Sequence, residues 1–290
     1  MCPRDRPTLR QMQHEIQTLR RQLAAREREL SEALQSAAHI QRSLIPRRPP
    51  SYHHLHFAWC FAPYKKVGGD LFNIAPLDEN TIMVYLIDVS GHGIASAMVS
   101  VAVHQSLSPT TGRLLKQPLS YRPYYRITFP HEVLAELDAE YPFERFEEFF
   151  TISYLLINPH TGQLRYANAG SPLPLLMRRD GTMERLDRGG PLIGLNHRDA
   201  SDEGEAWLRE GDRLFLYTDG LTEQIDSHGT QYGEARLVTS LDAWSGRDLG
   251  RACQEVMAAQ RAFAGEMPPQ DDMTLIGIEF SRREPAGMVT

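Results

Sequence analysis

The sequence predicts an α+β protein in which a layered sandwich follows a long N-terminal coiled-coil helix. Three observations support this fold class. Residues 9–45 contain neither glycine nor proline and follow a heptad pattern. After about residue 57, short β-prone runs alternate with turns and with a few helical patterns. Hairpin signals join some of these runs, so we expect mostly antiparallel strands with helices inserted between hairpins, which favours a layered sandwich.

The N-terminal helix is predicted from the unbroken alternation of three and four residues between apolar positions. Position a holds Leu9, Ile16, Leu23, Leu30, Ala37 and Leu44, and position d holds Met12, Leu19, Arg26, Ala33 and Ile40. This narrow seam predicts a parallel homodimer through residues 9–45, although Arg26 and the alanines weaken it. The alternative is one long amphipathic helix that folds back on its own domain.

Prolines mark the boundary between the helix and the rest of the chain. Pro46, Pro49 and Pro50 end the helix and make a short, stiff linker. We therefore expect residues 1–50 to form the helix and linker, residues 51–284 to form one domain, and residues 285–290 to form a tail.

Several runs in the domain predict individual elements. Residues 81–89 (TIMVYLIDV) are nearly continuously apolar and β-prone, which indicates a buried strand. Residues 149–158 and 163–168 flank a four-residue turn and predict a hairpin. Two more buried strands are expected at 212–218 and 273–280, and helices at 95–107 and 247–264. Residues 108–130 fit no period and are predicted to be a long surface loop.

Composition excludes several classes of protein. The net charge of −6 and the absence of a basic stripe argue against nucleic-acid binding. No run approaches 18 apolar residues, so neither a membrane span nor a signal peptide is expected. Three scattered cysteines without a CxxC pair fit a reducing compartment, and we expect a cytoplasmic protein.

Four aspartates at the ends of apolar runs or beside glycine carry the candidate chemistry. They are Asp70, Asp88, Asp219 and Asp271. One such aspartate is ordinarily a turn or cap residue. Four in separate segments, most of them next to a predicted strand, suggest a common site, where their repulsion would require cations. Oxygen ligands suit Mg²⁺ or Mn²⁺, and no Cys/His set has the spacing of a zinc site.

The motifs that hold these aspartates resemble a known family. In order they read VGGD, DVSGHG, TISYLLINPHTGQLRYANAG, YTDGLTE and DDMTL. Together they resemble the SpoIIE/RsbU branch of the PPM, or protein phosphatase 2C-like, metal-dependent phosphatases. Each motif alone is weak, because DG and GHG occur by chance. The ordered set is highly specific and spans about residues 57–280.

The resemblance implies a four-layer α-β-β-α sandwich with a site for two Mn²⁺ or Mg²⁺ ions. Carried over by motif, Asp88 bridges both ions and the Val89 carbonyl binds one of them. Asp219 and Asp271 complete the set on the second side, and Asp70 lies near the other ion, directly or through water. The two ions would make a bridging hydroxide at neutral pH, which attacks phosphorus in line.

Some positions depart from the family or leave a role open. Asp272 stands where related phosphatases often have Asn, so the ligand role is assigned to Asp271. An acidic residue usual in the family is replaced by Asn73, and a common histidine by Ser171. His92 is a candidate general acid for the leaving serine oxygen; the alternative is a loop histidine that shapes the glycine turn.

These features give two main readings of function. The first is a metal-dependent protein serine/threonine phosphatase, whose phosphoserine or phosphothreonine substrate, by resemblance, is an antagonist of an anti-sigma factor in a bacterial partner-switching pathway. The second is a non-catalytic signalling module that binds a phosphoprotein. Because such a module would be expected to lose metal ligands, the complete aspartate set favours the enzyme. A small-molecule phosphoesterase would keep the same metals but would need an enclosed pocket.

Overall fold

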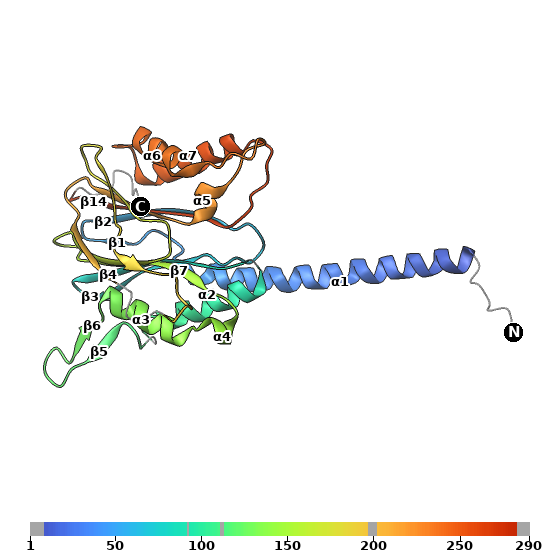
Figure 1. Cartoon of the computed structure of the whole chain (residues 1–290), viewed down its shortest axis with the longest axis horizontal. Coiled ribbons are helices and arrows are strands. Elements are labelled where there is room, and N and C mark those ends of the chain that lie inside the picture. Colours follow the sequence, from blue (N-terminus) through green and yellow to red (C-terminus); the bar gives the residue numbers. More distant parts are fainter. Residues whose placement is uncertain (1–8, 92, 111–112, 197–201, 283–290) are drawn as a thin grey trace, which may run out of the picture.

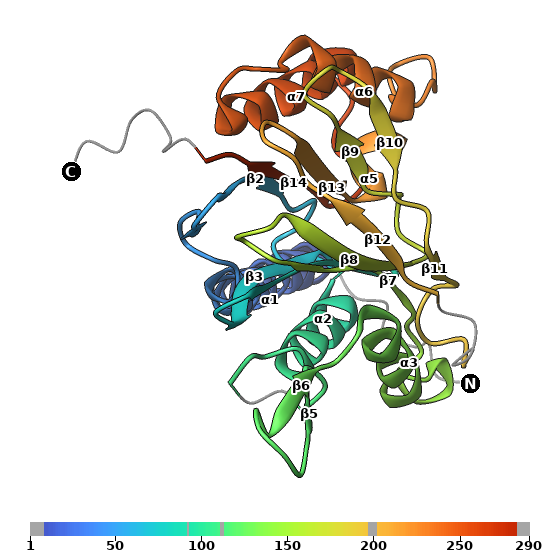
Figure 2. The ribbon, with the colours of Figure 1, turned by 90° about the vertical axis from the view of Figure 1, so that its left-hand side faces the viewer.

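Two β-sheets packed face to face form the body of the molecule. The computed structural model describes residues 9–91, 93–110, 113–196 and 202–282. Within these ranges the strands form two six-stranded sheets and one short ribbon. Helices lie against the outer face of each sheet (Figure 2), and the long helix α1 (Leu9–Leu44) projects from the body (Figure 1). The predicted α+β arrangement of flanked sheets is confirmed to this extent.

The first sheet contains both ends of the domain. Its order is β1 (Ser51–Tyr52), β2 (Leu55–Ala62), β14 (Met273–Phe280), β13 (Arg213–Tyr217), β9 (Leu175–Met177) and β10 (Met183–Arg185). Helices α6 (Gly233–Ala243) and α7 (Leu249–Ala264) cover its outer face (Figure 2). The central strands β13 and β14 are buried on both faces, which explains their nearly continuous apolar sequence.

The second sheet carries the hairpins predicted from the sequence. Its order is β11 (Gly189–Gly190), β8 (Gln163–Ala169), β7 (Phe150–Ile157), β4 (Thr81–Val89) and β3 (Leu71–Asp78), with β12 (Gly204–Trp207) paired to β8. All of these pairings are antiparallel except the short β11–β8 pair. Helices α2 (Ile94–Ser106) and α3 (Pro130–Glu140) lie against it (Figure 2), and α4 (Phe143–Phe146) follows α3.

Apolar burial between the layers holds the sheets in register. One cluster joins the facing sides of the two sheets and continues under α2 and α3. A second cluster lies between the first sheet and α6 and α7. Large side chains such as Phe72, Tyr85 and Phe150 are at most 1% exposed. Fully burying an aliphatic or aromatic side chain contributes about 1.5–3 kcal/mol, so this core fixes the relative position of the strand ends.

One predicted segment differs from the structure. Residues 108–130, expected to be a long surface loop, contain the two-stranded ribbon β5 (Lys116–Pro118) and β6 (Tyr125–Ile127). Leu114 and Leu115 before the ribbon are buried, and the ribbon leads directly into α3. The three-residue strands are too short to show a period of two, so the sequence pattern could not reveal them.

Helix α1 attaches to the body by a face that differs from its heptad seam. Leu34, Ala38, Gln41 and Ile45 turn toward the domain, where Ala38 packs against Val67 and Ala97. Each of these four residues directly follows a seam residue, so the two faces differ by roughly 100° around the helix. The large seam residues from Leu9 to Ile40 are 45–73% exposed. Among the described residues, no helix is both long and apolar enough to cross a membrane.

Candidate active site

The predicted aspartates lie at one end of the two sheets. Asp88 is the next-to-last residue of β4, and Asp70 directly precedes the neighbouring strand β3. On the other sheet, Asp219 begins helix α5 (Asp219–Glu223) after β13, and Asp271 and Asp272 directly precede β14. Because both strand pairs are antiparallel, the end of one strand and the start of its neighbour share an edge. The fold thus brings four sequence segments to a single edge of the sandwich.

Asp70 is the most deeply buried of these aspartates, and its hydrogen bonds connect the two sheets. Its side chain is fully buried, and its Oδ2 accepts hydrogen bonds from Thr218 Oγ1 at 2.9 Å and Thr274 Oγ1 at 2.5 Å. Burial, and then the charge of Asp272, raises the pKa of Asp70 well above its ordinary value. Its Oδ1 has no hydrogen-bond partner among the described residues. A buried carboxylate oxygen without a partner is costly, and a bound cation would satisfy it.

Asp88 is the electrostatic centre of the group. Burial, together with the charges of Asp70, Asp219, Asp271 and Asp272, raises the pKa of Asp88 to about 10. Burial and the charge of Asp271 also raise the pKa of Asp219, whose carboxylate hydrogen-bonds with the side chain of Asp88. Carboxyl groups raise one another's pKa in this way when they lie close together without a compensating positive charge.

Asp271 and Asp272 differ sharply although they are adjacent. Asp272 is 5% exposed, and its carboxylate accepts hydrogen bonds from the backbone nitrogens of Tyr64 at 2.7 Å and Asp70 at 3.4 Å. Asp271 is exposed, and its Oδ1 accepts a hydrogen bond from the backbone nitrogen of Asp272 at 2.8 Å. Asp272 is therefore committed to holding the segment before β3, whereas Asp271 is accessible from the mouth of the site.

The two glycines before Asp70 are required by the close approach of neighbouring groups. A Cβ atom on Gly68 would lie 1.9 Å from Asp272 Oδ2, and one on Gly69 would lie 2.4 Å from the Val89 carbonyl oxygen. Both distances are far shorter than a van der Waals contact, so a side chain at either position would force its neighbours to move. The VGGD motif thereby brings Asp70 next to the end of β4 and the Val89 carbonyl.

The donor chemistry of this group fits a hard divalent cation. Its donors are carboxylate oxygens, with the Val89 carbonyl close by, and this is the set that Mg²⁺ and Mn²⁺ prefer. No three His, Cys, Asp or Glu side chains in the described ranges are arranged so that they could hold a metal as they stand. Binding would therefore need some of these side chains to change conformation. The raised pKa values and the unpartnered Asp70 oxygen are the observations that support the fit.

The turn after β4 is fixed by the segment before β7. Ser90 Oγ donates a hydrogen bond to Glu148 Oε2 at 2.7 Å, and the backbone nitrogen of Phe149 donates to Ser90 Oγ at 3.1 Å. The backbone nitrogen of Ser90 in turn donates to the Phe149 carbonyl at 2.8 Å. His92, the candidate general acid, lies outside the described residues, so its role stays a prediction.

Helix α1 touches the site through a residue that the sequence did not single out. Gln41 Nε2 donates to the Gly68 carbonyl at 2.7 Å and to Ser100 Oγ at 3.1 Å, and the Gly68 nitrogen donates to Gln41 Oε1 at 3.3 Å. A buried glutamine thus binds both backbone polar groups of Gly68, two residues before Asp70. Its position outside the heptad seam was the only sequence signal, and a polar residue there ordinarily indicates a solvated helix face.

A second group of residues missed by the sequence analysis surrounds the aspartates. Thr218 and Thr274 stand inside the recognised motifs, but their bonds to Asp70 depend on how the two sheets meet. Glu223 lies near the mouth, where burial and the charges of Asp219 and Asp271 raise its pKa. Such residues cannot be assigned from spacing, because each acts across the sandwich.

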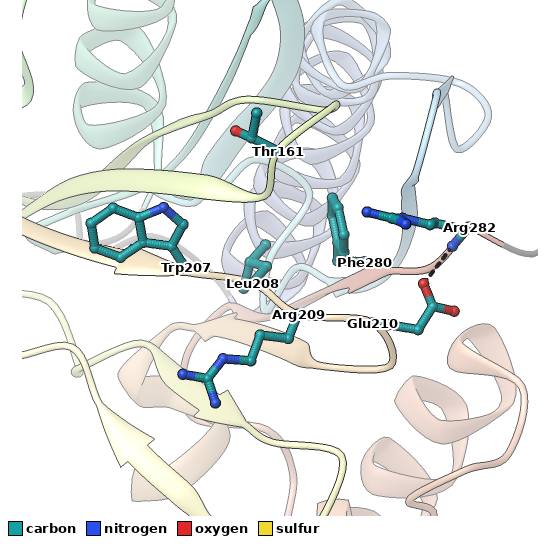
Figure 3. Close-up of a pocket in the computed structure, with 7 residues that line it drawn as sticks. All are labelled: Thr161, Trp207, Leu208, Arg209, Glu210, Phe280 and Arg282. Atoms are coloured by element: carbon teal, nitrogen blue, oxygen red, sulfur yellow. Dashed lines mark hydrogen bonds between the residues drawn. The ribbon is translucent and has the colours of Figure 1, made fainter.

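The pocket shown in Figure 3 lies at the other end of the sandwich. It has a volume of about 730 Å³ and is lined by Thr161, Trp207, Leu208, Arg209, Glu210, Phe280 and Arg282. Phe280 ends β14, whose opposite end carries Asp271 and Asp272. This pocket is therefore separated from the aspartates by the length of that strand and is not the candidate active site.

Comparison with known families identifies the region that contains most of the aspartates. The SpoIIE family, described as stage II sporulation protein E, matches residues 78–281. Phosphoserine phosphatase RsbP of Bacillus subtilis is 31% identical over 167 residues, covering 56% of this chain and 38% of RsbP. Phosphoserine phosphatase RsbU of the same organism is 26% identical over 206 residues, covering 70% of this chain and 57% of RsbU. The chain thus spans less than two thirds of either relative.

A solved structure supports the fold independently. The SiaA-PP2C domain of Pseudomonas aeruginosa superposes with a TM-score of 0.73 at 20% sequence identity, covering 89% of this chain and all of that domain. At this identity the likeness concerns the fold: two main sheets flanked by helices.

Proposed function

Because this chain belongs to the SpoIIE family of PP2C-type serine phosphatases, related to RsbU and RsbP, we propose that it hydrolyses phosphoserine or phosphothreonine on a protein. The observation that carries the proposal is the convergence of five aspartates on one edge of the sandwich, with the pKa of Asp88 raised to about 10. The fold that we assign is the PPM-type α-β-β-α sandwich, with residues 51–284 as the catalytic domain.

The aspartates would hold two divalent ions, Mn²⁺ or Mg²⁺. We assign Asp88 to both ions, Asp219 and Asp271 to one, and Asp70 with the Val89 carbonyl to the other. When bound, such ions neutralise phosphoryl charge and lower the pKa of a water molecule, which supplies the nucleophile at neutral pH. Phosphatases of this family use metal ions. We propose that the ions in this chain are Mn²⁺ or Mg²⁺.

The chain's own residues keep the site in place for this chemistry. Thr218 and Thr274 hold Asp70 by hydrogen bonds to one oxygen, which leaves its other oxygen for a cation. Asp272 fixes the backbone of the same segment. Positioning of this kind is what phosphoryl transfer requires of a protein, because the reaction demands alignment and charge neutralisation.

A protein substrate suits the openness of this edge better than a small molecule does. Asp271 is exposed at the mouth of the site. RsbP and RsbU are named as phosphoserine phosphatases. We propose that the substrate is an antagonist of an anti-sigma factor in a bacterial, cytoplasmic switch. The alternative function is a non-catalytic phosphoprotein-binding module, which the intact aspartate set disfavours.

We also propose that residues 9–45 pair two chains as a parallel coiled coil. The exposed seam supports this, because it runs along the face that α1 does not use to contact its own domain. Large apolar side chains exposed in a continuous line usually mark an interaction surface. The seam ends at Leu44, which packs against the domain core.

Turnover of different phosphate esters separates the candidate functions. With Mn²⁺ present, we expect release of phosphate from a phosphoserine peptide to exceed release from sugar phosphates. Binding of the peptide without any release would support the non-catalytic module. Preference for a sugar phosphate would support a small-molecule phosphoesterase and contradict the proposal.

A further inference from the structure

Three exposed apolar side chains form a patch close to the candidate active site. Phe143, Phe149 and Leu195 are 44%, 38% and 46% exposed. The two phenylalanine rings have centroids 6.4 Å apart, and the Phe143 nitrogen donates a hydrogen bond to the Gly194 carbonyl at 3.0 Å. A Cβ atom on Gly194 would lie 3.4 Å from Phe149 Cβ, so the segment that carries Leu195 also meets Phe149. We call these three residues the phenylalanine patch.

The patch is continuous with the turn that follows Asp88. The backbone of Phe149 exchanges hydrogen bonds with the backbone nitrogen and the hydroxyl of Ser90. The next residue, Phe150, pairs with Val89 across the sheet. A ligand that places a phosphate at the aspartates therefore has the patch beside it. Apolar surface next to a polar site is an ordinary arrangement for recognition of a protein segment.

The charges around the patch indicate which partner would fit. Residues 143–149 contain three glutamates and one arginine. Glu148 is bound to Ser90, and the Arg145 guanidinium lies 5.0 Å from the centroid of the Phe146 ring, whereas Glu144 and Glu147 are exposed. Glu223 adds a further acid near the mouth of the site. Basic side chains on a partner would complement this rim.

We propose that the phenylalanine patch is the docking surface for the phosphoprotein substrate. The partner would place apolar side chains on Phe143, Phe149 and Leu195, and Lys or Arg beside Glu144 and Glu147, while its phosphoserine lies at the aspartates. This inference rests on the proposed phosphatase function and adds the sequence context that the enzyme selects. The surface contributes binding energy remote from the reacting bond, which raises specificity without changing the chemistry.

The test compares synthetic phosphoserine peptides that differ only in their flanking residues. One peptide has Leu and Lys beside the phosphoserine, a second has Leu and Glu, and a third has Gly and Ser. For the unaltered chain with Mn²⁺, we expect kcat/KM to be about tenfold higher for the Leu/Lys peptide than for the Gly/Ser peptide, corresponding to about 1.4 kcal/mol. An equal kcat/KM for the three peptides would overturn the proposal.

Variants test whether the preference for the Leu/Lys peptide arises from the phenylalanine patch. The triple change Phe143→Ser, Phe149→Ser and Leu195→Ser should bring the Leu/Lys to Gly/Ser ratio close to one. Trp207→Ser is the matched control, because Trp207 is 51% exposed near the opposite end of the sandwich and should leave the ratio high. The double change Glu144→Lys and Glu147→Lys should shift the preference from the Leu/Lys peptide toward the Leu/Glu peptide, and it tests the surface without removing apolar groups.

The outcomes separate this inference from the proposed function. Absence of any turnover, including turnover of an aryl phosphate with Mn²⁺, would refute the phosphatase function itself. Turnover with an unchanged peptide ratio in the triple variant would refute only the docking surface. Sedimentation of the triple variant gives a third outcome. If the change converts a dimer into a monomer, the patch is a contact between copies of this chain and the proposal is wrong.

Discussion

At the scale of single residues, the proposed chemistry depends on carboxylates that the fold brings close together. Asp88 is half-buried among four other aspartates, and its pKa of about 10 expresses the cost of charging it without a cation. Replacing Asp88 with Asn should abolish turnover and leave the fold intact. It should also raise the melting temperature of the metal-free protein, because Asp88 must take up a proton when the chain folds at neutral pH without a cation, and Asn has no such cost. Thermal unfolding with chelator present measures this, and substantial activity of the variant at saturating Mn²⁺ would contradict the role of Asp88.

The adjacent acids Asp271 and Asp272 should respond in opposite ways to substitution. Asp271→Asn should lower turnover strongly with little effect on stability, because Asp271 is exposed and is one of the residues that we propose as metal ligands. Asp272→Ala should lower the free energy of unfolding by about 1–3 kcal/mol, since the backbone nitrogens of Tyr64 and of the buried Asp70 lose this acceptor. Urea unfolding and phosphate release measured on both variants check the assignment. A stable, fully active Asp271→Asn variant would mean that the ligand is Asp272.

His104 gives a pH dependence that is separate from catalysis. Its Nδ1 lies 2.7 Å from the hydroxyl of the fully buried Tyr85, and burial lowers the pKa of His104 below 6.5. The unfolded chain therefore binds this proton more readily than the folded chain. The resulting stability is complete above pH 6.5 and declines as pH falls from 6.5 toward the lowered value. His104→Gln should flatten the pH dependence of urea unfolding in this range; an unchanged slope would argue against it.

At the scale of elements, helix α1 has two faces with different tasks. One face binds the domain through Ala38, Gln41 and Ile45, and the other exposes the seam. Because Gln41 holds the backbone N–H and C=O of Gly68, just before Gly69 and Asp70, a change in helix packing would reach the site directly. We propose that helix α1 acts as a regulatory switch through this contact, which requires a second packing arrangement of the helix.

The seam can be tested without disturbing the docked face. Ile16→Lys with Leu23→Lys should give a monomer whose phosphatase activity differs from that of the unaltered chain, since both residues are remote from the domain contact. Deleting residues 1–44 should also give a monomer, but it removes Gln41 and Ala38 as well. Sedimentation at tens of micromolar checks both variants, with Arg20→Lys as the matched surface control. A monomeric unaltered chain would refute the coiled coil, and an unchanged rate would mean that the helix is only a tether.

Sequence patterns predicted the elements whose burial is uniform along their length. Strands β4 and β14 begin and end where their apolar runs do, because they are buried on both faces. The hairpin β7–β8, helix α2 and helix α7 were predicted to within one or two residues of each end. Strand β3 was missed, because Asn73 and Pro76 interrupt its apolar run. The ribbon β5–β6 was missed because its strands have three residues each.

Only those site residues that stand in the sequence motifs and have a known role there could be predicted. Four of the five aspartates were expected to converge, and they do lie at one edge of the sandwich. Their assignment to particular ions remains a prediction. The roles of Thr218, Thr274 and Gln41 could not be predicted, because each acts on a residue far away in the chain. Such partners are set by how the sheets and the helix pack, which a single sequence does not encode as a local pattern.

At the scale of the whole molecule, the two sheets divide the site between them. The second sheet provides Asp70 and Asp88, and the first provides Asp219, Asp271 and Asp272. The core between the sheets holds these groups together against their repulsion. The apolar burial that stabilises the sandwich therefore also maintains a concentration of negative charge that a pair of divalent cations would neutralise.

The most direct test of the account is phosphate release from a phosphoserine peptide by protein stripped of metal. We expect no release in chelator, recovery of turnover when excess Mn²⁺ or Mg²⁺ is added, and no recovery in the Asp88→Asn variant. Equal folding of the two proteins, checked by circular dichroism, is the control. Turnover that persists in chelator, or that returns equally in Asp88→Asn, would contradict the claim that these aspartates form a metal-dependent phosphatase site.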